Sequence, residues 1–162
     1  MRIVVLGLIG LLGLTGTSAA DEAGCKTFKW PVTREQALFS IAPAAASGTE
    51  IAVGAAAHLA LAPADTVAFT VPPEHAPAAG TFGATANVMV PPQGEIQITL
   101  SDEGWIDVIQ DGHAVPAANF SGVKSCPGIR KSVRFKLMSG AAVVQFSGVR
   151  KADLKVAVLA PE

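Results

Sequence analysis

Apolar and polar residues alternate with a period of two along most of the second half of the chain. One face of the first run carries Phe82, Ala84, Ala86, Val88 and Val90. The next run places Ile96, Ile98 and Leu100 on one face, and further runs follow over 105–109, 133–137, 142–146 and 154–158. A period of two is typical of strands that bury one face, so each run is predicted to be a strand.

Short polar turns separate these runs. Pro91–Gly94, Ser101–Gly104, Asp111–Gly112 and Ser139–Gly140 each interrupt the alternation. Closely spaced strands joined by such turns favour an antiparallel pairing. The sequence therefore predicts an all-β fold, an antiparallel β-sandwich or jelly roll of about eight to nine strands.

The first half of the chain is less regular. Phe28 and Trp30 have the spacing of one strand face, and Pro31 ends that strand. Thr33–Gln36 reads as a capping box, with Thr33 as N-cap of a short helical turn through Phe39. Beyond a loop over 42–48, short β runs are expected over 51–53, 58–61 and 67–71. The proline-rich segment Val71–Pro77 is predicted to be a long connection, because proline lacks the N–H that a central strand needs.

Residues 1–20 have the pattern of a secretory signal peptide. Arg2 precedes an apolar run from Ile3 to Leu14, and small residues at 18–20 favour cleavage before Asp21. The run of about 12 residues is too short to span a bilayer, so no stable membrane span is predicted. An uncleaved anchor and lipidation at Cys25 remain alternatives. We expect one domain over 21–162, in the periplasm or secreted.

Two cysteines, Cys25 and Cys126, lie in the predicted mature chain. An even number in an oxidising compartment favours a disulfide, and only one pairing exists. A pair of metal-binding or redox thiols is the alternative, although there is no Cys-x-x-Cys. The bridge would connect the N-terminal segment to the C-terminal half.

Charge is distributed unevenly along the mature chain. Residues 21–119 hold three basic and eleven acidic residues, whereas residues 120–162 hold eight basic and two acidic residues. Such asymmetry predicts a surface for an anionic partner, unless the two halves mix their charges on folding. The net charge of the mature chain is only about −2, so no nucleic-acid partner is expected.

Four segments carry a resemblance to a known family. They are Gly94–Leu100, Trp105–Gly112, Val133–Gly140 and Val144–Gly148. Through them the stretch from Gly80 to Leu159 resembles the β-sandwich modules of the bacterial pre-peptidase C-terminal (PPC) type. This resemblance implies a module that accompanies an enzyme or binds a matrix.

Two segments carry a second resemblance. With Trp-Ile-Asp-Val at 105–108 and Cys-Pro-Gly-Ile-Arg-Lys-Ser-Val at 126–133, the chain is similar to a set of small exported α-proteobacterial proteins. Some of these carry the label homogentisate 1,2-dioxygenase, which implies a metal-dependent oxygenase of cupin type as an alternative function.

Three cations and one tryptophan are candidate ligand-binding residues. Arg134 and Lys136 share a face of one predicted strand, and Arg130 precedes them with the same parity. A cationic sheet face of this kind can hold an anionic polymer. Trp105 is either an exposed platform for sugar stacking or a core anchor, and we expect a core position.

Candidate metal ligands cluster in one short span. Asp107, Asp111 and His113 could contribute to an iron site with two histidines and a carboxylate, with His58 joining from a distant strand. However, a cupin would supply His-x-His, which the chain lacks. Asp102, Glu103, Asp107 and Asp111 offer oxygens for calcium, without the spacing of a known calcium loop. No cofactor is predicted, with calcium or iron as the alternatives.

These observations rank three functions. The leading hypothesis is an exported, non-catalytic binding module for an envelope polymer, a glycan or a protein. The second is a small metal-dependent oxygenase, and the third is a structural accessory subunit.

Overall fold

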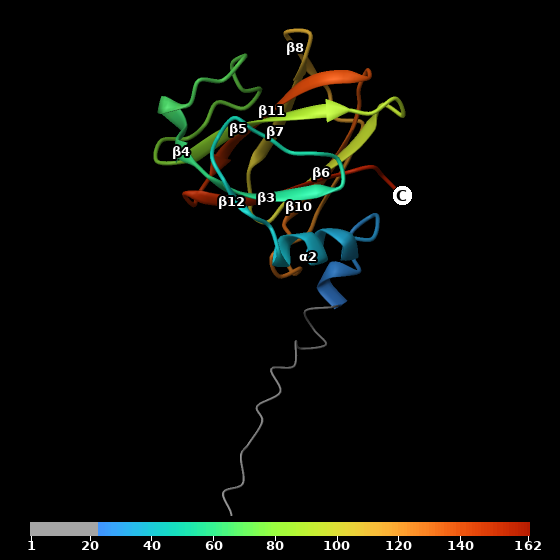
Figure 1. Cartoon of the computed structure of the whole chain (residues 1–162). Coiled ribbons are helices and arrows are strands. Elements are labelled where there is room, and N and C mark those ends of the chain that lie inside the picture. Colours follow the sequence, from blue (N-terminus) through green and yellow to red (C-terminus); the bar gives the residue numbers. More distant parts are fainter. Residues whose placement is uncertain (1–22) are drawn as a thin grey trace, which may run out of the picture.

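The computed structural model describes residues 23–162, and the chain folds as a sandwich of two β-sheets (Figure 1). The all-β sandwich predicted from the alternating pattern is confirmed. Twelve strands lie in the described part of the chain, more than the eight or nine expected, because several have only two to four residues. The predicted signal peptide, residues 1–20, lies outside the described residues.

One sheet, here the first sheet, has six strands. Their order is β1 (Ala44–Ala45), β3 (Ala55–Ala60), β12 (Asp153–Leu159), β6 (Glu95–Leu100), β10 (Lys131–Lys136) and β9 (Asn119–Gly122). Neighbouring strands are antiparallel except β1 and β3, which pair in parallel. The antiparallel prediction therefore holds for the long strands but not for this short pair.

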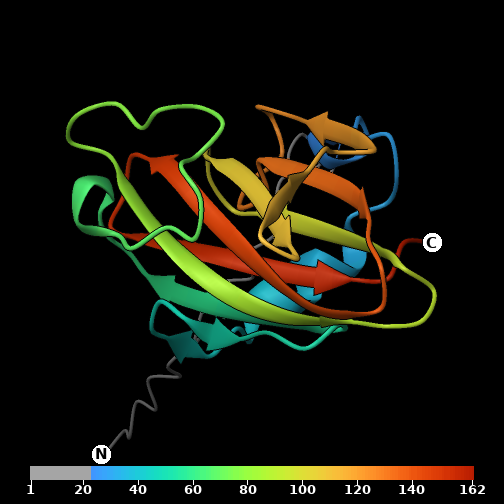
Figure 2. The same ribbon diagram turned by 90° about the horizontal axis from the view of Figure 1, so that it is seen from above.

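The opposing second sheet also has six strands. Its order is β2 (Thr49–Glu50), β5 (Phe82–Val90), β11 (Gly140–Val149), β7 (Trp105–Gln110) and β8 (His113–Val115), with β4 (Ala62–Pro63) also paired to β5. Only the short β2–β5 pair is parallel. Figure 2 shows the long strands β5 and β11 crossing the sandwich side by side.

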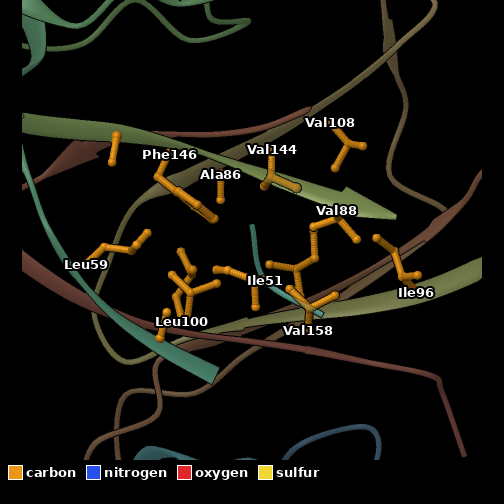
Figure 3. Packing of buried hydrophobic residues seen from close by; sticks show 14 of the residues in the cluster. Ile51, Leu59, Ala86, Val88, Ile96, Leu100, Val108, Val144, Phe146 and Val158 are labelled. Atoms are coloured by element: carbon orange, nitrogen blue, oxygen red, sulfur yellow. The ribbon is translucent and has the colours of Figure 1, made fainter. Parts of the chain in front are cut away.

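The main core lies between the two sheets and uses the apolar positions that alternate in the sequence (Figure 3). Ile96, Ile98 and Leu100 of β6 face Val144 and Phe146 of β11, and all are fully buried. Large side chains in such a core each contribute about 1.5–3 kcal/mol through burial. The period-two pattern therefore fixes which face of each strand turns inward.

A second, smaller core forms on the outer side of the first sheet, where helix α2 (Thr33–Ser40) packs (Figure 1). Phe28, Trp30 and Phe39 are buried there, and the Cys25–Cys126 disulfide fastens this segment to the connection between β9 and β10. The disulfide prediction is confirmed. The predicted strand around Phe28 and Trp30 is wrong, because these side chains pack onto the sheet as an irregular segment.

The predicted capping box is also wrong in detail. The helix begins at Thr33, the N-cap position is Val32, and no side chain caps the helix. The Gln36 amide, expected to reach back to the N-cap, instead donates to Cys25 Sγ at 3.4 Å. The disulfide that draws this segment against the sheet thus offers Gln36 a different partner.

A polar network connects helix α2 to the first sheet. Glu35 is completely buried, and its Oε1 accepts a 2.5 Å hydrogen bond from the amide of Gln97. The Thr99 hydroxyl lies 3.2 Å from the same oxygen and 2.8 Å from Ser132 Oγ, which accepts from Trp30 Nε1 at 3.0 Å. The N-terminal segment thus buries these polar residues, and they hydrogen-bond to one another, although the second carboxylate oxygen of Glu35, Oε2, has no hydrogen-bond partner.

Residues 67–81, here called the strap, connect the 3-10 turn Ala64–Thr66 to β5 and cross the outer side of the second sheet. The strand expected over 67–71 is absent. Gln145 of β11 instead accepts from the backbone N–H groups of Thr70 and Val71 at 2.6 and 3.2 Å, and donates to the Val71 carbonyl at 3.0 Å. The long connection expected over 71–77 is confirmed.

Among residues 23–162, no helix has the length and apolar character to cross a membrane.

Candidate functional site

A groove with a volume of about 490 Å³ lies at one end of the sandwich, where strands of both sheets terminate. We call it the basic groove. It is lined by Glu103, Gly104, Trp105, Phe120, Gly122, Lys124, Arg130, Lys131, Gly148 and Arg150. Four cations and one carboxylate give it a formal charge of +3. All four cations come from residues 120–162, the part of the chain in which basic residues outnumber acidic ones.

Trp105 forms a wall of the basic groove. Its side chain is 43% exposed, so the core position expected from the sequence is wrong. The strand face that Trp105 shares with Asp107 points away from the main core, whereas Val108 on the other face points into it. The face of β7 that carries Trp105 and Asp107 is therefore an outer face of the second sheet.

Lys131, like Lys124 and Arg150, lines the groove without having been a candidate ligand-binding residue. It has the parity of the inward-facing Val133 and Phe135 but stands at the first position of β10, where the core ends. Its Nζ donates to the Gly104 carbonyl at 2.6 Å and lies 4.5 Å from the centre of the Trp105 ring. Burial lowers the pKa of Lys131 from its ordinary value. The sequence did contain a signal for this residue, because a lysine stands at the start of a predicted strand in a position whose parity is that of the inward-facing residues.

Arg130, one of the candidate ligand-binding residues, lies in the groove with Glu103 as its ion-pair partner. Its guanidinium donates to Glu103 Oε1 at 2.5 Å. The hydrogen bond and charge of Arg130 lower the pKa of Glu103, and the charges of Arg150 and Lys124 contribute in the same direction. These three cations therefore converge on one carboxylate, and only one of them forms an ion pair with it.

Arg134 and Lys136 do not join Arg130. Arg134 Nε donates to Gln97 Oε1 at 2.9 Å, and its guanidinium carbon lies 4.2 Å from the centre of the Trp30 ring. Lys136 is exposed at the far end of β10. The expected cationic strand face is thus divided, because the N-terminal segment covers the middle of β10.

The candidate metal ligands lie in different environments. Asp107 is buried, Asp111 occupies the turn after β7 with φ of 51°, and His113 is exposed with Nδ1 2.8 Å from the Asp111 carbonyl. His58 lies on the first sheet, where Nε2 is 2.9 Å from Asp153. In residues 23–162, no three His, Cys, Asp or Glu side chains are placed to hold a metal ion.

The acids considered for calcium are also separated. Asp102 pairs with Lys151 at 2.5 Å and Glu103 pairs with Arg130, whereas Asp107 points to the outer side of the second sheet. The strands place Asp102 and Glu103 in the turn before β7, with Asp111 in the turn after it. The carboxylates of Asp102 and Glu103 are therefore separated from that of Asp111 by the length of β7, although the three residues are close in the sequence.

A larger recess of about 700 Å³ lies beside the disulfide and is lined by the N-terminal segment, with Phe28, Lys29 and Trp30 among its residues. Lys29 donates to Asn119 Oδ1 at 3.3 Å and lies over the ring of Phe120. Fewer cations meet there than in the basic groove, so we take the groove as the candidate site.

Comparison of the chain with known protein families, with curated proteins and with solved structures gives no match.

Proposed function

We propose that this protein is an exported, non-catalytic binding module, and that the basic groove holds an acidic glycan of the cell envelope. The observation that carries the proposal is the convergence of Lys124, Arg130, Lys131 and Arg150 around a single carboxylate, Glu103. A concave surface with one sign of charge attracts ions of the other sign more strongly than a flat one.

The chemistry of the groove favours a polymer with anionic groups and sugar rings. Lysine offers a compact charge and arginine a planar fork that matches carboxylate, sulfate or phosphate. The exposed Phe120 and the half-exposed Trp105 add apolar surface at the same place. Aromatic side chains with a few placed polar groups are typical of ligand sites.

The compartment is part of the proposal. The leader pattern in residues 1–20 and the Cys25–Cys126 disulfide both favour an oxidising location outside the cytoplasm. Fractionation of a bacterial host, with N-terminal sequencing of the product, tests it. Recovery of a chain that begins at Asp21 in the periplasm or medium supports export, and a cytoplasmic chain with an intact leader contradicts it.

The groove is tested by titrating the purified protein with polygalacturonate in a calorimeter, with neutral dextran as the comparison glycan. The double variant Lys124→Glu/Arg150→Glu reverses two exposed cations of the groove. The control Lys26→Glu/Lys136→Glu reverses two exposed cations outside it. Both variants change the net charge equally, so non-specific attraction is matched.

We expect the groove variant to bind polygalacturonate at least tenfold more weakly than the parent, and the control to bind within twofold of it. Dextran should not bind measurably to any of the three proteins. An equal loss in both variants would show non-specific attraction and overturn the groove. Absence of binding by the parent would overturn the acidic-glycan function.

A further inference from the structure

The strap covers one face of the Trp105 indole. The imidazole of His75 stacks on it with ring centroids 3.6 Å apart and planes 3° from parallel. Lys131 Nζ lies 4.5 Å from the ring centre, and an imidazole at 3.6 Å leaves no room for it on the same side. Lys131 therefore covers the opposite face, and Trp105 separates the strap from the basic groove.

Two buried polar oxygens without partners lie beside Trp105 on the covered side of the second sheet. Ser147 of β11 pairs with Trp105 of β7, and Asp107 is the next residue of β7 with the same outward parity. Ser147 is completely buried and Asp107 is 7% exposed. Neither Ser147 Oγ nor Asp107 Oδ2 has a hydrogen-bond partner. Buried polar atoms are rarely left unpaired in proteins, so these two call for an explanation.

The strap is fastened to the sheet before it reaches Trp105. Gln145 holds the backbone of Thr70 and Val71, as described above. Pro72, Pro73 and Pro77 follow, and they have no N–H with which to pair to a strand. His75 lies between these prolines and is itself exposed apart from its stacked face. The preceding residue, Glu74, has its backbone N–H directed at the Asp107 carboxylate. The imidazole can therefore leave the indole without breaking the Gln145 contacts, and only the contact of Glu74 with Asp107 lies close enough to be exchanged for one with the ligand.

We propose that Trp105, Asp107 and Ser147 form a subsite for one sugar ring of the ligand, and that His75 occupies it in the free protein. The proposal rests on the glycan-binding function proposed above. A sugar ring that replaced the imidazole would stack its C–H face on the indole, and its hydroxyls would reach Asp107 Oδ2 and Ser147 Oγ. The basic groove on the other face of Trp105 would hold an acidic group of the same polymer.

This arrangement predicts that the strap competes with the ligand. A ligand that binds only the open form has its affinity reduced by the fraction of protein that is open. Stacked aromatic pairs are modestly stable, so removing His75 should raise the apparent affinity by about threefold to tenfold. The ligand class that results is an acidic polysaccharide whose sugar rings are accessible for stacking.

The test compares His75→Ala with His58→Ala, titrated with polygalacturonate. His58→Ala is the control, because it also replaces a histidine, but one that lies on the first sheet, away from the strap. We expect His75→Ala to bind threefold to tenfold more tightly than the parent and His58→Ala to bind within twofold of it. Unchanged or weaker binding by folded His75→Ala overturns the subsite.

A second measurement uses the unmodified protein, in case His75→Ala fails to fold. Proton NMR reports the stacking directly, because the indole shifts the His75 ring protons while the rings are in contact. We expect these signals to move to the positions of a free imidazole as polygalacturonate saturates the protein. Signals that stay shifted at saturation overturn the subsite. Loss of binding in the Lys124→Glu/Arg150→Glu variant would still support the groove, so the two proposals fail separately.

Discussion

The guanidinium of Arg134 lies over the ring of Trp30, 4.2 Å from its centre, and so connects the outer face of the first sheet to the N-terminal segment. Arg134 Nε also donates to Gln97, whose own amide donates to the buried Glu35. Arg134 therefore belongs to the contacts that hold helix α2 and the preceding residues against the sheet.

We predict that Arg134→Ala lowers the free energy of unfolding by about 1–2 kcal/mol, because it removes a cation–π contact and a charged hydrogen bond. Urea unfolding measures this change. The neighbouring Lys136→Ala removes an exposed cation from the same strand and should change stability by less than about 0.5 kcal/mol. Equal effects of the two substitutions would contradict the role of Arg134.

We predict that the Cys25→Ser/Cys126→Ser variant is less stable than the parent by about 2–5 kcal/mol. The disulfide joins residues 101 positions apart and holds the N-terminal segment on the first sheet. Urea unfolding followed by tryptophan fluorescence measures the loss, since Trp30 lies in the cluster that the disulfide fastens.

The matched control for the disulfide is the same unfolding experiment with reductant. Reductant should destabilise the parent and leave the double variant unchanged, because only the parent has a bond to reduce. Thiol titration of the unreduced, denatured parent should find no free thiol. Two free thiols, or a parent insensitive to reductant, would contradict the disulfide.

We predict that Gly148→Ala is more destabilising than Gly112→Ala by about 1 kcal/mol. Both glycines have positive φ, 68° and 78°, so both substitutions strain the backbone. A Cβ on Gly148 would in addition sit 3.0 Å from Trp105 Cδ1, whereas a Cβ on Gly112 meets nothing within 4 Å.

Thermal or urea unfolding of the two glycine variants measures the difference. Because Gly148→Ala pushes against the indole, it should also weaken polygalacturonate binding, while Gly112→Ala should not. Equal stability losses together with unchanged binding would show that Gly148 does not set the position of Trp105.

We predict that Asp107→Asn is more stable than the parent at pH 7. Burial raises the pKa of Asp107 above its ordinary value of 3.8, and the charge of the Glu74 carboxylate raises it further. The hydrogen bond from the Glu74 backbone N–H and the charge of His75 lower the pKa, but burial is the largest effect. The folded protein therefore binds this proton more tightly than the unfolded chain does. Stability is lost as pH rises from about 3.8 through the higher pKa of the folded state.

Urea unfolding of both proteins between pH 3 and pH 7 measures this effect. The advantage of Asp107→Asn should be largest at neutral pH and should vanish below the ordinary pKa, where the aspartate is neutral in both states. An advantage that does not depend on pH, or a variant less stable than the parent at pH 7, would contradict the raised pKa.

The strands of the main core could be predicted because their signal is local. Ile96, Ile98 and Leu100 alternate with Gln97 and Thr99, and a strand with that pattern buries one face whatever its neighbours are. The partner of each cysteine in a disulfide was also determined, since the chain contains only Cys25 and Cys126. The sequence alone thus predicts the all-β sandwich and the only disulfide that its two cysteines can form.

Only the tertiary structure determines which segments cover the outer faces of the two sheets. Alternation shows that Arg134 and Gln97 point away from the main core, but it does not show which segment then packs on them, and it did not place Trp105 on an outer face. The N-terminal segment buries Gln97 and holds Arg134, whereas the strap leaves Trp105 half exposed beside Lys131. These contacts join residues far apart in the chain, so the local periodicity of the sequence cannot predict them. The four groove cations likewise come together only when the chain folds.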